Sequence, residues 1–120
     1  MKFHELPVVF LSYKEDKALE NYAALKEQVS HALHVEGVKG FDAAHKEAAR
    51  QAKEWATKVG IDVAEHPYFI TVDADNTVRP EFWLLETDHM YSSIYYRDRR
   101  PGPGMSVLSW NAYNGITGLA

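Results

Sequence analysis

The order of apolar and amphipathic segments limits the fold of this 120-residue chain more than any other feature. Apolar runs at 7–13 and 68–72, and a weaker alternating segment at 31–38, are typical of buried strands. Apolar residues recur at helical spacing over 15–29 and 40–60, between these runs. This order favours parallel βαβ units with right-handed crossovers. We therefore predict an α/β fold in which helices flank a mostly parallel sheet.

Short signals mark where some of these elements begin and end. Ser12 and Glu15 have the spacing of a capping box, which predicts a strand-to-helix turn at 12–14 and a helix from about residue 15. Gly60 is the residue type that commonly follows a helix, so the second helix is expected to stop there. A further apolar run at 105–110 is predicted to form the last strand.

The composition sets outer limits on function. With 46% hydrophobic and 25% charged residues, the chain has enough apolar material for one core, and we predict a single domain over 1–120. A net charge of −4 argues against general nucleic-acid binding. The absence of cysteine excludes disulfides, thiolate metal sites and a cysteine nucleophile. Without an apolar run of about 18 residues, we expect no membrane partner and a cytoplasmic location.

The last residues, 115–120, are apolar and uncharged and have no terminating signal. This pattern favours a chain that is truncated at the carboxyl end of a longer domain. Unpaired strand edges at such a truncation would promote self-association, so a homo-oligomer is expected.

Two carboxylates, Asp73 and Asp75, follow the apolar run at 68–72 and are separated by Ala74. The carboxyl ends of parallel strands border the crevice in which open α/β sheets bind ligands. Carboxylate oxygens are ligands of hard divalent cations, so the motif predicts a Mg²⁺ or Mn²⁺ site that takes part in phosphate chemistry. The alternative is a plain turn in which aspartate side chains accept hydrogen bonds from backbone N–H groups.

Three segments together resemble the amino-terminal half of a GT-A glycosyltransferase of the Asp-x-Asp type. They are PVVFLSY at 7–13, GVKGFDAAHKEAARQA at 37–52 and YFITVDADNTVRPEF at 68–82. The segment SWNAYNG at 109–115 is similar to phage and bacterial glycosyltransferase-like proteins. The resemblance implies a GT-A-like fold with a Rossmann-like nucleotide-binding half. It also implies transfer of a sugar from a nucleotide-sugar donor to an acceptor that the sequence does not identify.

The resemblance further implies roles for individual residues. Asp75 would bind the divalent cation, Mn²⁺ or Mg²⁺, that bridges the donor diphosphate, and Asp73 would contact the cation or the ribose. The nucleotide-sugar would also contact Leu11, Ser12 and Tyr13 at the base and ribose, and Lys39, Gly40 and His45 or Lys46 near the diphosphate. Asp88 and Asp98 are candidates for the catalytic base.

Two other functions fit parts of the pattern. The segment FITVDADNTV at 69–78 also matches the motif of haloacid-dehalogenase phosphatases, which would make Asp73 the nucleophile and Asp75 the acid/base. That family needs a later lysine, and no lysine follows Lys58. The third hypothesis is a noncatalytic α/β module that binds a partner through aromatic residues toward the carboxyl end.

Several of these candidate residues also fit purely structural roles. Ser12 can be a plain helix cap, and His45 lies near a helix start beside its apolar face. Arg97, Arg99 and Arg100 are typical of a solvated loop, with phosphate or acceptor contact as the alternative. Packing is favoured over sugar stacking for the aromatic residues Trp83, Tyr91, Tyr95, Tyr96 and Trp110.

Overall fold

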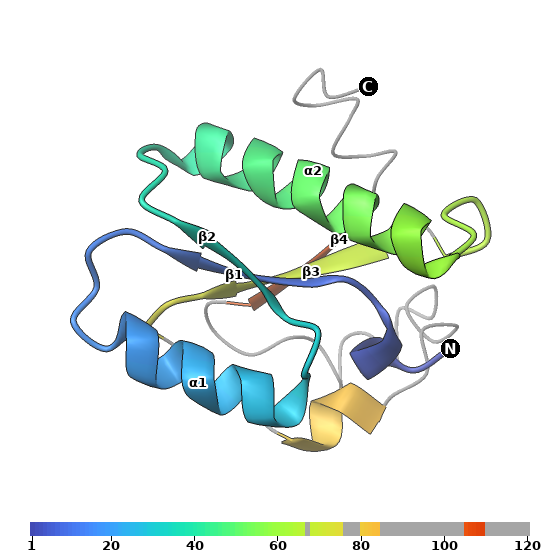
Figure 1. Ribbon diagram of the computed structural model, residues 1–120, viewed down its shortest axis with the longest axis horizontal. Coiled ribbons are helices and arrows are strands. Elements are labelled where there is room, and N and C mark those ends of the chain that lie inside the picture. Colours follow the sequence, from blue (N-terminus) through green and yellow to red (C-terminus); the bar gives the residue numbers. More distant parts are fainter. Residues whose placement is uncertain (67, 76–79, 85–104, 110–120) are drawn as a thin grey trace, which may run out of the picture.

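The computed structural model describes residues 1–66, 68–75, 80–84 and 105–109. In this part of the chain it confirms an α/β fold, with three parallel strands, a fourth antiparallel strand and two α-helices (Figure 1). No helix in these ranges is both long and apolar enough to cross a membrane. The base candidates Asp88 and Asp98, the arginine-rich segment 97–100 and the aromatic residues at 91–96 and 110 lie outside the described residues.

The sheet is built around β1, which spans Val8–Ser12 and is buried along its whole length. β2 (Leu33–Glu36) and β3 (Tyr68–Asp73) pair with β1 on opposite sides, and both are parallel to it. β4 (Met105–Ser109) pairs antiparallel with β3, which gives the order β2-β1-β3-β4. The central position of β1 explains its almost uninterrupted apolar sequence, because both of its faces are covered.

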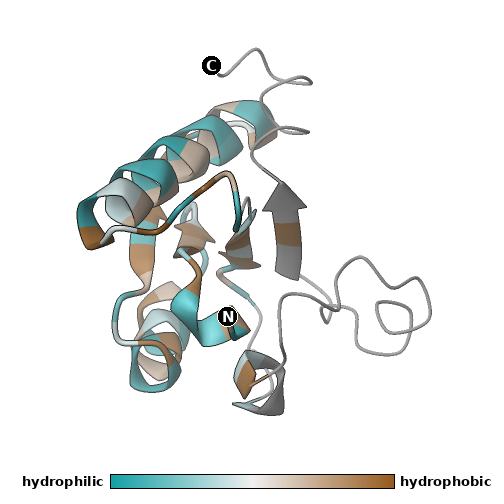
Figure 2. Cartoon of the chain, turned by 90° about the vertical axis from the view of Figure 1, so that its right-hand side faces the viewer, coloured by the Kyte–Doolittle hydropathy of each residue, from teal (hydrophilic) through white to brown (hydrophobic). Residues whose placement is uncertain are grey.

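One helix covers each face of the sheet. α1 (Ala18–Gln28) connects β1 to β2, and α2 (Phe41–Val59) connects β2 to β3 (Figure 1). Because these connections lead in opposite directions across the sheet, right-handed crossovers place the helices on opposite faces. Figure 2 shows α2 and α1 on either side of strands that carry hydrophobic colours. Two short 3-10 helices, η1 (Phe3–Glu5) and η2 (Pro80–Leu84), contribute to the core on the α1 side.

Alternation along β1 divides the core into two parts. Val8 and Phe10 pack on the α1 side, in a cluster that includes Leu25 of that helix. Val9 and Leu11 pack on the α2 side. On this side α2 contributes small residues, namely Ala48, Ala49 and Ala52. Their short side chains allow the α2 backbone to lie close to the sheet, as the alanine-rich sequence predicts.

The capping box predicted from Ser12 and Glu15 is wrong. α1 begins at Ala18, later than the predicted residue 15, and its N-cap residue makes no side-chain capping bond. The Ser12 hydroxyl is instead hydrogen-bonded to His34 of the neighbouring strand, with Oγ and Nε2 2.6 Å apart. The Glu15 carboxylate accepts a hydrogen bond from the N–H of Tyr13. Since the partner of Ser12 is distant in the sequence, local spacing does not reveal it.

Trp83 is a packing residue, as expected from the sequence. Only 3% of its surface is exposed, and it belongs to the cluster that contains Phe3 and Leu25. Its indole Nε1 donates to Oε1 of Gln28 at the end of α1, over 2.7 Å. One large side chain therefore joins η2 to the α1 side of the core.

His31 connects the loop between α1 and β2 to α2 and to the segment that precedes β1. Its ring stacks on Trp55 of α2, with centroids 4.3 Å apart and an interplanar angle of 13°. Its Nε2 donates to the carbonyl oxygen of Leu6 at 2.8 Å, because a carbonyl can only accept. Burial lowers the pKa of His31; the hydrogen bond to Leu6 opposes this change, and nearby His4 and Lys26 reinforce it.

Acidification is expected to destabilise the fold through His31. A folded-state pKa below the ordinary value of 6.5 means that the unfolded chain binds the proton more readily. The contribution of neutral His31 to stability is therefore present above about pH 6.5 and is lost as the pH falls through the lowered pKa. The melting temperature of His31→Gln should fall less between neutral pH and about pH 5 than that of the wild type. His66→Gln is the control, and an unchanged pH dependence in His31→Gln would contradict this role.

Candidate functional site

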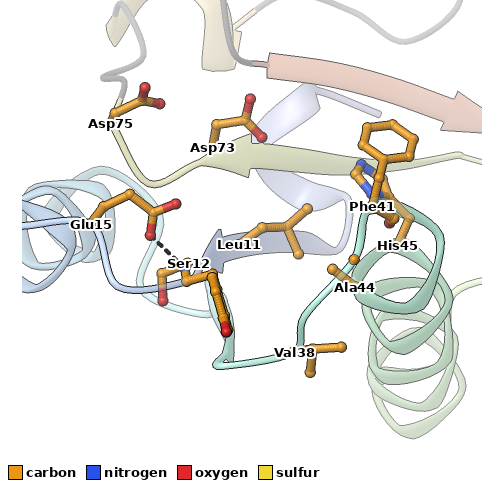
Figure 3. Close-up of a pocket in the computed structure, with 11 residues that line it drawn as sticks. Leu11, Ser12, Glu15, Val38, Phe41, Ala44, His45, Asp73 and Asp75 are labelled. Carbon is orange, nitrogen blue, oxygen red and sulfur yellow. Dashed lines mark hydrogen bonds between the residues drawn. The ribbon is translucent and has the colours of Figure 1, made fainter.

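A pocket of about 330 Å³ lies at the carboxyl ends of β1 and β3 (Figure 3). The strand order reverses here, because the chain first moves from β1 to β2 and then crosses back over β1 to β3. Connections that diverge in this way leave a crevice in which open α/β sheets bind ligands. The volume falls within the range of small-molecule sites.

Most residues that were predicted from the sequence to bind a ligand line this pocket. They are Leu11, Ser12, Tyr13, Gly40, His45, Asp73 and Asp75. Lys39 and Lys46 are exposed and do not line it. Glu15, Phe41 and Ala44 also line the pocket and were not predicted to do so, and Val38 lines it beside the predicted contacts Lys39 and Gly40. Glu15 matches a capping pattern and Phe41 matches the apolar face of a helix, so neither pattern signals a ligand. The placement of Glu15 and Phe41 beside the carboxyl ends of the strands is visible only in the fold.

The backbone of the turn at Asp73–Asp75 is held by both β1 and α1. Asp73 ends β3 opposite Leu11 of β1. Ala74 is 1% exposed and belongs to the core cluster on the α1 side. The side-chain amide of Asn21 in α1 donates to the Ala74 carbonyl oxygen at 2.7 Å. Because the central residue is fixed through both its side chain and its carbonyl, the two flanking aspartates are held in place at the pocket (Figure 3).

Negative charge is concentrated at this turn. Asp73 is exposed overall, but its carboxyl lies at the pocket and is partly desolvated. This desolvation is the main reason that the pKa of Asp73 is raised, and the negative charges of Asp75 and Glu15 raise it further. Nearby His45 acts in the opposite direction and lowers the pKa of Asp73. A cation between Asp73 and Asp75 would relieve their repulsion.

The donor set fits a divalent cation that is completed by a phosphate ligand. Mg²⁺ usually keeps several waters and is bound through one or two carboxylates plus substrate phosphates. Asp73 and Asp75 meet this requirement. Within residues 1–66, 68–75, 80–84 and 105–109, no group of three or more histidine, aspartate or glutamate side chains is placed to hold a metal ion. A cation held by these two aspartates would need further ligands, which water and a phosphate group can supply.

The pocket lining contains no lysine, although the Lys14 ammonium lies over the ring of the lining residue Tyr13. Every lysine of the chain lies within residues 1–66, and none lines the pocket. Arg50, on the exposed face of α2, is paired with Glu47 at 2.6 Å and with Glu54 at 3.0 Å. The other arginines lie outside the described residues. A phosphate group in the pocket would meet the carboxylates of Asp73 and Asp75 and no lining lysine, so a divalent cation would favour its binding.

The amino terminus of α2 forms another part of the pocket wall. Its N-cap, Gly40, has φ +101°, a backbone conformation that favours glycine, and it makes no side-chain capping bond. The first N–H groups of a helix lack intrahelical acceptors, and the helix dipole adds partial positive charge there. No residue of α1 lines the pocket.

The turn after β1 has an unusual backbone conformation. Lys14 has φ +64°, in the left-handed region that non-glycine residues rarely occupy. The preceding strand end is held to the segment after β2, because the Gly37 N–H donates to the Ser12 carbonyl at 2.9 Å. Strained backbone of this kind persists where surrounding contacts fix it, and it is often found beside ligand sites.

Removing the charge of Asp73 is expected to stabilise the metal-free fold near neutral pH. The folded-state pKa is raised above the ordinary 3.8, so the folded chain binds this proton more readily than the unfolded chain. The resulting stability is present below about pH 3.8 and is lost as the pH rises through the raised pKa. Asp73→Asn should therefore melt at a higher temperature than the wild type in EDTA at neutral pH, with a smaller difference in acid.

The matched control is Asp16→Asn, because Asp16 is an exposed aspartate that does not line the pocket. This variant should show no such gain. An equal or lower melting temperature for Asp73→Asn at neutral pH would contradict the view that its carboxylate is held in an unfavourable environment.

Comparisons of the chain with protein families, with curated proteins and with solved structures find no match. Function must therefore be inferred from the chemistry of the pocket.

Proposed function

We propose that this chain binds a nucleotide-sugar donor through Mn²⁺ or Mg²⁺ held by Asp73 and Asp75, and that it transfers the sugar to an acceptor as GT-A glycosyltransferases do. The observation that carries the proposal is the presence of two carboxylates, those of Asp73 and Asp75, and the start of α2 in one pocket, where the strand order reverses. A diphosphate suits such a pocket, because a divalent cation and helix N–H groups both attract its oxygens.

Each part of the pocket would meet a different part of the donor. Asp73 and Asp75 would hold the cation, which would supply the Lewis acidity that neutralises a nucleoside diphosphate leaving group. Gly40, at the start of α2, would lie near the diphosphate. Residues 11–13, at the end of β1, would contact the ribose and base. The acceptor and the catalytic base are left open, since Asp88 and Asp98 lie outside the described residues.

A phosphohydrolase receives less support from the pocket. With Asp73 as nucleophile and Asp75 as acid/base, the phosphorylated intermediate would need a nearby lysine to neutralise its charge. No lysine lines the pocket, although all lysines of the chain lie in the described range 1–66. The noncatalytic module rests on aromatic residues of which only Trp83 is described, and Trp83 is buried.

Thermal-shift measurements separate these hypotheses. The chain would be melted with UDP, GDP or a nucleotide sugar, in the presence of either Mn²⁺ or EDTA. A ligand at about 100 times its Kd stabilises a protein by about 2.7 kcal/mol. In a chain of this size that corresponds to a rise in Tm on the order of 10 °C. We expect this rise only when nucleotide and Mn²⁺ are both present.

Two results would contradict the proposed glycosyltransferase function. No shift with any nucleotide would rule out donor binding. Hydrolysis of a generic phosphate ester that disappears in Asp73→Asn would support the phosphohydrolase instead. If the nucleotide sugar binds, release of nucleoside diphosphate in the presence of candidate acceptors measures transfer itself.

A further inference from the structure

One wall of the pocket is apolar. It is formed by Leu11, Val38, Phe41 and Ala44, which come from β1, the β2–α2 loop and the first turn of α2 (Figure 3). None of these side-chain types can donate or accept a hydrogen bond. Since Asp73 and Asp75 supply negative charge elsewhere in the same pocket, a ligand that fills it should have one charged and one apolar part.

Phe41 stands out in this wall because 76% of its surface is exposed. Leaving a ring of this size in water forgoes the free energy that burial of an aromatic side chain provides. The ring is nevertheless supported by His45, with centroids 4.1 Å apart and an interplanar angle of 30°. His45 is only 8% exposed, and its Nδ1 donates to the Phe41 carbonyl oxygen at 2.8 Å. A buried and anchored imidazole therefore holds an exposed ring at the pocket.

Tyr13 is the other exposed aromatic residue at the pocket, with 38% of its surface exposed. The ammonium nitrogen of Lys14 lies over its ring, 5.2 Å from the centroid. The ring of Tyr13 thus already has a cationic neighbour. Phe41 is the more open of the two rings and belongs to the apolar wall.

We propose that Phe41, supported by His45, stacks on the nucleobase of the bound nucleotide, so that the base is held by its face. This inference rests on the proposed function, because a cation at Asp73 and Asp75 is what would fix the diphosphate of the same ligand. Stacking accepts every base, since each has a π-face. Purines bring a larger ring to bury than pyrimidines do. The pocket should therefore bind ADP and GDP more tightly than UDP and CDP.

Calorimetric titration of Phe41→Ala tests this inference. ADP, UDP and pyrophosphate would each be titrated, with Mn²⁺, into the wild type, Phe41→Ala and Leu19→Ala. Loss of base stacking should weaken ADP binding by about 5- to 150-fold. Pyrophosphate has no base, so its affinity should be unchanged. Leu19 is an exposed apolar residue in the first turn of α1 and does not line the pocket, so Leu19→Ala should leave all three affinities unchanged.

The possible results distinguish this inference from the proposed function. Equal ADP affinity in the wild type and Phe41→Ala would overturn the stacking role and leave metal-dependent diphosphate binding intact. Tighter wild-type binding of UDP than of ADP would contradict recognition by the face of the base. No binding of any nucleotide or pyrophosphate by the wild type would instead overturn the proposed function, and this inference with it.

A second variant covers the case in which Phe41→Ala also weakens pyrophosphate binding through damage to the start of α2. Phe41→Trp keeps an aromatic ring at the same position. ADP affinity close to that of the wild type in Phe41→Trp would support stacking. ADP affinity as low as that of Phe41→Ala would overturn it.

Discussion

Replacing Asp75 with asparagine is expected to abolish the metal-dependent stabilisation of the chain by a nucleoside diphosphate. A neutral amide oxygen is a weaker ligand for a hard cation than a carboxylate, and the variant would leave one carboxylate, Asp73, at the cation. Mutation of a residue that only hydrogen-bonds to a metal ligand typically lowers the metal affinity about 10- to 100-fold. Loss of a ligand itself should therefore lower the metal affinity by about 100-fold or more. The measurement is the shift in Tm on adding nucleotide at fixed Mn²⁺.

Asp73→Asn should lose the same shift, although its metal-free form is expected to be more stable than the wild type. Removing both carboxylates should cost little more than removing one, because they would hold a single ion and their effects are not additive. Asp16→Asn should retain the full shift, since Asp16 does not line the pocket. A normal shift in Asp75→Asn would show that this carboxylate does not bind the cation.

Replacing Trp83 with alanine is expected to destabilise the fold by about 3–5 kcal/mol. The side chain is 3% exposed in the core cluster on the α1 side. Its removal would leave a cavity and would also remove the hydrogen bond to Gln28. Urea unfolding measures the loss as a lower midpoint at an unchanged m-value.

Two comparison variants separate packing from hydrogen bonding at this position. Gln28→Ala removes the acceptor of this hydrogen bond and keeps the indole, and it should cost about 1 kcal/mol. Leu84→Ala changes the adjacent residue, which is 62% exposed, and should cost about 0.5 kcal/mol or less. A cost below about 1 kcal/mol for Trp83→Ala would contradict the assignment of this side chain to the core.

The arrangement of strands and helices could be predicted because burial leaves a periodic trace in the sequence. The continuous apolar run at β1 reflects a strand covered on both faces, and the pattern at 40–60 reflects one face of α2 against the sheet. The start of α1 could not be predicted in the same way. Ser12 has the residue type of a helix cap, but His34 on the next strand binds its hydroxyl. The spacing of nearby residues does not reveal a hydrogen-bond partner that is distant in the sequence.

Part of the candidate site could also be predicted from the sequence. Asp73 and Asp75 lie at the pocket because the end of a parallel strand fixes their position. The parts contributed by loops and helix starts were less predictable. Lys39 and Lys46 flank the start of α2 in sequence but do not line the pocket, whereas Phe41 does. Which side of a helix start faces a crevice depends on how the helix packs, and the sequence pattern does not specify that packing.

The most direct test of metal-bridged nucleotide binding is calorimetric titration of ADP and UDP into the wild-type chain, with Mn²⁺ and again with EDTA. We expect saturable binding with Mn²⁺ and a much lower affinity in EDTA, because the cation would neutralise the carboxylates of Asp73 and Asp75 and bind the diphosphate. Binding with Mn²⁺ should also be lost in the Asp73→Asn, Asp75→Asn double variant. Equal affinity with and without the metal, or full Mn²⁺-dependent binding by the double variant, would contradict the proposed site.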